Sequence, residues 1–248
     1  MENSMTTILN ASTSNRSYDG AASITEDGNW KTLYMTGGVS ALVVLFMIPV
    51  QVVLYIIYPP PDTVAGFFAM MQENAVIGLI SLDLLYMLTI VLMGLVVLAV
   101  CVALRRANQS LVTIALFIAL VSTAMYFASC VAFDMLQLSN QYTAATDEAR
   151  RAMFLAAGEG MLATYKGTAY NVSYVLAAVS GLILAVVMLR SDVFDRKTAY
   201  TGIVMNVMGL IPGTAGTIGL VFAFASLIPT VVWLALVARR LYKLGRAG

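Results

Sequence analysis

The chain of 248 residues contains no histidine, only two cysteines and few charges. Without imidazole there can be no histidine-ligated zinc, haem or copper site, no histidine general base and no serine triad of the usual kind. Charged residues make up 11% of the chain and hydrophobic residues 60%, which would leave a soluble domain of this size with too little polar surface. The net charge of +1 gives no basis for nucleic-acid binding. We expect no metal ion and no cofactor.

Long apolar runs fill most of the chain after Lys31, and most of them are long enough for a helix to cross a hydrocarbon core of roughly 30 Å. The last stretch, residues 199–238, is too long for one crossing, and the segment 212–217 is suited to a turn between two. A kinked or broken helix at Pro212 is the alternative. We therefore predict an all-α polytopic membrane protein, a bundle of six transmembrane helices over about residues 34–58, 76–104, 111–138, 167–189, 197–212 and 218–238.

Residues 1–31 are predicted to form a disordered polar tail, followed by a transmembrane domain over residues 32–244. Lysine and arginine concentrate in alternate connections, which favours a cytoplasmic location for both termini. On that side we place Arg16, Lys31, Arg105, Arg106, Arg190, Arg196, Lys197, Arg239, Arg240, Lys243 and Arg246. The outer loops then carry Arg150, Arg151 and Lys166.

Two outer loops are predicted to contain helices. Asp62 and Thr63 can cap a short helix in which Val64, Phe67, Phe68 and Met71 recur at helical spacing. Residues 146–148 can open another helix through Ala149, Ala152, Met153 and Ala156. These segments either complete the fold as connections or cover a cavity that faces outward.

Polar residues inside the apolar runs are the candidate site. Asp83 is predicted about seven residues into the second helix, roughly 10 Å from its outer end. An ionised carboxylate there costs a few kcal/mol unless it is paired, hydrated or protonated. Asp134, Gln51 and Asn171 fall at comparable depths, so these four residues are the predicted ligand or proton site. The alternative is a structural role, with Asp83 protonated, Asp134 at the headgroups and both amides bridging helices.

Several segments resemble a known family. The likeness begins at Phe67-Phe68 and at Gly78 to Asp83, and it is stronger over residues 187–191 and 198–203. These segments resemble a family of prokaryotic multi-pass membrane proteins called domain of unknown function 4386. The resemblance implies a six-helix bundle in the prokaryotic plasma membrane, and it implies no activity and no catalytic residues.

Three classes of function follow from these observations. The first is a small-solute or proton-coupled permease that uses Asp83, with Asp134, in an outward-facing polar pocket and binds a small polar or cationic solute. The second is a non-enzymatic membrane sensor or partner-binding subunit, acting with a membrane protein or as a homo-oligomer. The third and least favoured is an intramembrane enzyme in which Asp83 and Asp134 share a proton. In every case the lipid bilayer is the main partner.

Overall fold

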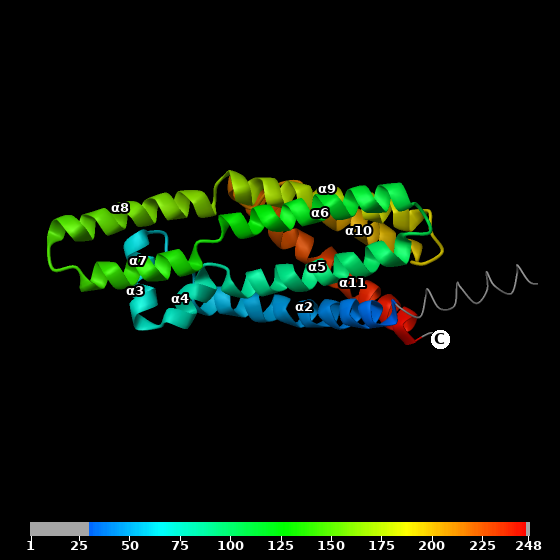
Figure 1. Cartoon of the computed structure of the whole chain (residues 1–248), viewed down its shortest axis with the longest axis horizontal. Coiled ribbons are helices and arrows are strands. Elements are labelled where there is room, and N and C mark those ends of the chain that lie inside the picture. Colours follow the sequence, from blue (N-terminus) through cyan, green and yellow to red (C-terminus); the bar gives the residue numbers. More distant parts are fainter. Residues whose placement is uncertain (1–29, 247–248) are drawn as a thin grey trace, which may run out of the picture.

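The computed structural model describes residues 30–246, and over this range the chain is helical with no strand. Six helices form an elongated bundle and the other four form a head at one end of it (Figure 1). The predicted polar tail lies almost wholly outside the described residues. The first bundle helix, α2 (Lys31–Ile57), begins at the end of the bundle opposite the head, and the last, α11 (Gly216–Arg246), ends there (Figure 1).

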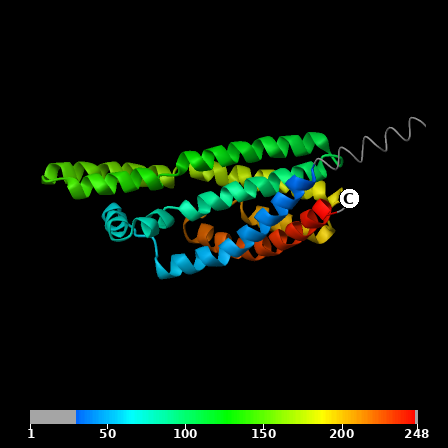
Figure 2. The ribbon, with the colours of Figure 1, turned by 60° about the horizontal axis from the view of Figure 1, so that its bottom comes forward.

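The bundle closes on itself as a ring. Along the ring, α2 (Lys31–Ile57) packs on α5 (Leu84–Leu104), α5 on α6 (Gln109–Ser129), and α6 on α9 (Thr168–Leu189). Then α9 packs on α10 (Arg196–Met208), α10 on α11 (Gly216–Arg246), and α11 returns to α2. The second view shows α2 and α11 side by side on the same flank of the bundle (Figure 2). The core between these helices is almost entirely aliphatic.

Five helical stretches of the described chain are long and apolar enough to cross a membrane. They are Lys31–Ile57, Leu84–Leu104, Gln109–Ala144, Glu148–Leu189 and Gly216–Arg246. The prediction of an all-α protein is confirmed for residues 30–246, and the five stretches support a membrane protein, whereas the predicted count of six transmembrane helices is not confirmed. The predicted fifth helix, residues 197–212, is shorter than expected because α10 ends at Met208 and the chain turns through Gly209–Ala215 before α11. Pro212 lies in that turn.

The head consists of α3 (Val64–Glu73), α4 (Ala75–Ser81), α7 (Ala132–Ala144) and α8 (Glu148–Tyr165). Both predicted loop helices are present. Thr63 caps α3 by accepting a hydrogen bond from the Gly66 amide, and Asp147 caps α8 by accepting one from the Arg150 amide. The apolar face predicted for α3 is buried in the core of the head, against residues of α4 and α7.

Two predicted transmembrane helices are each divided in two. The helix expected over 76–104 is broken at Leu82 and Asp83 into α4 and α5, and the one expected over 111–138 is broken at Cys130 and Val131 into α6 and α7. Neither break contains proline or glycine. Leu82, Val131 and Ala132 are buried in the head core, so tertiary packing explains the breaks better than local sequence does. The helix predicted over 167–189 agrees with α9 to within one residue.

Candidate functional site

The site lies at the junction between the bundle and the head. Asp83 is buried, with 8% of its surface exposed, and it is the one non-glycine residue with positive φ among residues 30–246. Aspartate tolerates this left-handed conformation better than most residues. Its backbone remains satisfied, since its N–H donates to the Ile80 carbonyl and its carbonyl accepts from the Met87 N–H. The helix therefore breaks at Asp83 with little loss of backbone hydrogen bonds.

Two tyrosines from different regions hold the Asp83 carboxyl. The Tyr55 hydroxyl, from the last turns of α2, donates to Oδ1 at 2.6 Å. The Tyr165 hydroxyl, from the end of α8, donates to Oδ2. One carboxyl thus joins a bundle helix, a head helix and the break between α4 and α5. No lysine or arginine of residues 30–246 forms an ion pair with it.

More tyrosines surround this centre. The Tyr86 and Tyr126 rings meet edge to face with centroids 5.3 Å apart, and Tyr170 lies between Tyr165 at 6.4 Å and Tyr174 at 6.2 Å. The Tyr126 side chain is buried, and its hydroxyl has no hydrogen-bond partner in the described part of the chain. A buried hydroxyl usually finds a partner. This aromatic group therefore offers both ring faces and a polar atom beside Asp83.

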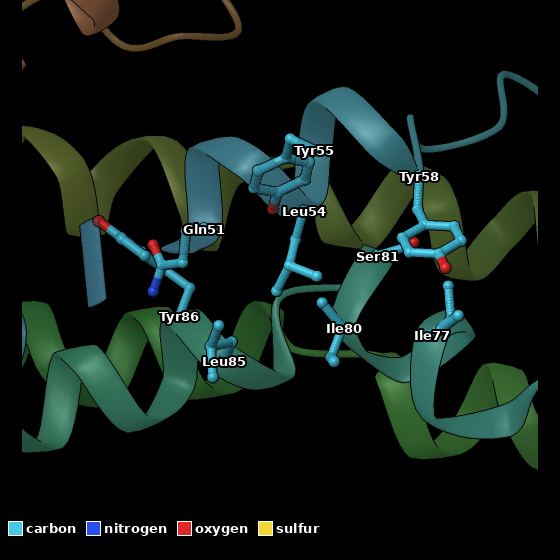
Figure 3. Close-up of a pocket in the computed structure, with 9 residues that line it drawn as sticks. All are labelled: Gln51, Leu54, Tyr55, Tyr58, Ile77, Ile80, Ser81, Leu85 and Tyr86. Atoms are coloured by element: carbon cyan, nitrogen blue, oxygen red, sulfur yellow. The ribbon is translucent and has the colours of Figure 1, made fainter. Parts of the chain in front are cut away.

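A small cavity of about 20 Å³ opens next to Tyr55, between the last turns of α2 and the α4–α5 segment (Figure 3). Its polar lining consists of Gln51, Tyr55, Tyr58, Ser81 and Tyr86. Its apolar lining consists of Leu54, Ile77, Ile80 and Leu85. A volume of this order holds about one water molecule and lies far below the volume of a small-molecule site. Asp83 does not line the cavity itself and is connected to it through the Tyr55 hydroxyl.

The four predicted site residues do not all meet. Gln51 lies one turn before Tyr55, lines the cavity, and donates from Nε2 to the Thr89 hydroxyl at 2.8 Å. Asn171 instead ties the start of α9 to the α10–α11 turn, because its Oδ1 accepts from the Thr214 hydroxyl. Asp134 is exposed on α7, and both Asp83 oxygens are bonded to tyrosines. The structure thus joins Asp83 and Gln51 to one site and places Asn171 and Asp134 elsewhere.

Sequence reasoning placed Asp83 inside a continuous helix and missed Tyr165 altogether. The residue lies immediately before α5, at the head end of the bundle, rather than about two turns inside a helix. Tyr165 lies beyond Ala156, the last residue named for the predicted loop helix, so nothing linked it to Asp83. Which tyrosines face Asp83 could only come from the fold.

The buried Asp83 carboxyl is suited to two chemical roles, proton transfer and attraction of cations. An acid in a site poor in water can hold or release a proton, and its charged form attracts cations strongly. No group of three histidine, cysteine or acidic residues that could hold a metal ion occurs in residues 30–246.

Comparison with protein-family models, curated proteins and solved structures finds no match to this chain.

Proposed function

We propose that this protein is a proton-coupled permease for a small polar or cationic solute in the prokaryotic plasma membrane. The observation that carries the proposal is the buried carboxyl of Asp83, held by tyrosines from two regions and linked through one of them to a cavity. Ionisable groups retained at such places commonly belong to a substrate or proton path. Asp83 would carry the proton, and the solute would approach it beside Tyr55, where this structure has a cavity with room for about one water molecule.

Six crossings remain our preferred topology, with α10 and the turn after it as the short fifth crossing. The hydrogen bond between Thr214 and Asn171 supports this count. Asn171 lies in the first turn of α9, whereas α10 begins beside the other end of α9, just after Arg190. The segment from Arg196 to Thr214 therefore covers nearly the whole depth of α9.

The distribution of charge supports cytoplasmic termini and an outward-facing cavity. Arg105, Arg190, Arg196 and Arg246 all lie at helix ends remote from the head. Basic residues prefer the cytoplasmic side of a membrane. The α6 helix alone is about 31 Å long at 1.5 Å per residue, enough to cross the hydrocarbon core, so the head would project outside the cell.

A membrane sensor is the second candidate, and one contact favours it. Tyr165 is contributed by α8, a head helix with few contacts to the bundle beyond its own continuation into α9. A change in protonation or solute occupancy at Asp83 would alter this bond and could move α8 without any transport. The two functions share the binding site and differ in whether anything crosses the membrane.

Proton flux in reconstituted vesicles separates these functions. Vesicles that contain a trapped pH-sensitive dye would be given a pH gradient and a panel of small polar and cationic solutes. We expect a solute to accelerate proton movement in the wild type and not in Asp83→Asn. Asparagine is a suitable replacement because it also tolerates the left-handed backbone of residue 83.

Asp134→Asn is the matched control, since it removes an exposed acid of the head and should leave the flux unchanged. Equal flux in Asp83→Asn and the wild type would remove Asp83 from the mechanism. No flux in either protein, together with a solute-dependent change in trypsin cleavage at exposed Arg150 or Arg151 of α8, would favour the sensor.

A further inference from the structure

A second cavity lies at the end of the bundle opposite the head, where the start of α2, the end of α5, the α9–α10 connection and the end of α11 come together (Figure 1). Its volume is about 340 Å³, which falls within the range of small-molecule sites. Its polar lining consists of Tyr34, Arg105 and Arg106. Guanidinium groups donate several N–H bonds in a geometry that matches phosphate and carboxylate oxygens. The cavity is therefore suited to an anion.

The surroundings of the cavity are strongly positive as well. Among residues 30–246, the acidic residues at this end of the bundle are Asp192 and Asp195, both in the α9–α10 connection. Basic residues outnumber them and come from every element that begins or ends there. Besides the two arginines of the lining, they include Lys31, Arg190, Arg196, Lys197, Arg239 and Lys243. An anion near the cavity is thus attracted by many charges, and two of them line the cavity itself.

The length of α5 places the two lining arginines at the level of lipid headgroups. Leu84–Leu104 has 21 residues and is about 31 Å long at 1.5 Å per residue, close to the roughly 30 Å of a hydrocarbon core. Arg105 and Arg106 follow directly after this helix. The Arg105 guanidinium also lies over the Trp30 ring, 5.1 Å from its centroid, and tryptophan is enriched where membrane and water meet. The anions closest to such a site in a membrane are lipid phosphates.

We infer that this cavity binds the phosphate headgroup of an anionic phospholipid, with Arg105 and Arg106 at the phosphate. A soluble phosphate ester offers the same anion, but it has no use for the rest of the lining, which is aliphatic and suits the upper part of an acyl chain. These aliphatic residues are Val102, Ala103, Val193 and Leu244. Basic pockets between transmembrane helices are known to hold anionic headgroups. The site is separate from Asp83 and does not depend on the proposed transport.

Phosphatidylglycerol and phosphatidylcholine with identical acyl chains form the test pair. Their binding to the purified full-length protein in a neutral detergent would be titrated by native mass spectrometry. We expect the wild type to prefer phosphatidylglycerol, and Arg105→Gln combined with Arg106→Gln to weaken its binding by about 5- to 30-fold. Arg239→Gln combined with Lys243→Gln is the matched control, because it removes the same charge from exposed residues of this end that do not line the cavity. The control should retain the preference.

Arg106→Gln alone guards against a folding defect in the double variant, because Arg106 is exposed, and it should weaken phosphatidylglycerol binding by about 5-fold. Equal binding of the two lipids to the wild type would overturn the inference. Equal losses in the two double variants would also overturn it, since binding would then reflect the general charge of this end rather than the cavity. Glycerol phosphate tests the source of the anion. It should not displace phosphatidylglycerol at equal concentration, and displacement would assign the cavity to a soluble phosphate ester instead of a lipid.

Discussion

The bundle and the head are packed in different ways. In the bundle, helices approach closely through small residues and serine hydroxyls: Ser122 donates to the Ser173 carbonyl and Ser180 to the Ala115 carbonyl, both at 2.7 Å. The head closes around larger side chains, including Phe67, Phe68, Met71 and Met135. Close backbone approach is how helices associate in lipid, where burial of apolar surface gives little driving force. The head instead resembles the core of a small soluble domain, which is consistent with a location outside the hydrocarbon.

The largest effect is expected from loss of a large buried side chain in the head core. Phe68 is 1% exposed, and its ring centroid lies 5.4 Å from that of Tyr142. Phe68→Ala should lower the stability of the head by about 3–5 kcal/mol, because the substitution leaves a cavity. The measurement is the rate of trypsin cleavage at Arg150 and Arg151 in α8, which should rise while the bundle remains helical by circular dichroism.

Phe133→Ala is the matched control, because Phe133 is also a head phenylalanine but is 58% exposed. It should leave the cleavage rate close to that of the wild type. Equal sensitivity of the two variants would contradict a packed head core built around Phe68.

Much of the fold could be predicted from the sequence because length and hydropathy determine which segments cross a lipid bilayer. The α9 helix and the loop helices α3 and α8 agree with their patterns, and Thr63 and Asp147 cap as expected. The breaks before Asp83 and at Cys130 could not be predicted, since no proline or glycine marks them. They exist because Leu82 and Val131 are buried in a head core that only tertiary packing creates.

The site was predictable to a similar extent. An acid in an apolar run identifies Asp83, and helix depth associates it with Gln51. Depth alone could not show which way a side chain faces, so Asn171 and Asp134 were grouped with it although they lie elsewhere. Tyr165 enters the site only because α8 folds back along α7 and ends beside the break.

Addition of a single methyl group should be felt in the bundle. A Cβ at Gly181 of α9 would lie 2.1 Å from Asn206 Oδ1 of α10, and the Asn206 amide already donates to the Gly202 carbonyl at 2.7 Å. Gly181→Ala should cost about 1–3 kcal/mol as overpacking, lowering the thermal unfolding temperature in detergent. Gly94→Ala on α5 meets nothing within 4 Å, so it should be neutral or slightly stabilising. A higher unfolding temperature for Gly181→Ala than for Gly94→Ala would mean that α9 and α10 are not in close contact.

The smallest effects are expected at the junction of the two regions, where paired tyrosine variants separate a bonded hydroxyl from an unbonded one. Tyr55→Phe removes the donor to Asp83 Oδ1 and should cost about 1 kcal/mol, because the partly exposed site lets water replace part of the bond. Tyr126→Phe removes a buried hydroxyl without a partner in the described chain, so its unfolding free energy should be unchanged or slightly higher. Thermal unfolding of both variants in the same detergent measures the difference. Destabilisation of Tyr126→Phe as large as that of Tyr55→Phe would show that the Tyr126 hydroxyl is hydrogen-bonded in the protein, so that it belongs to the polar contacts around Asp83.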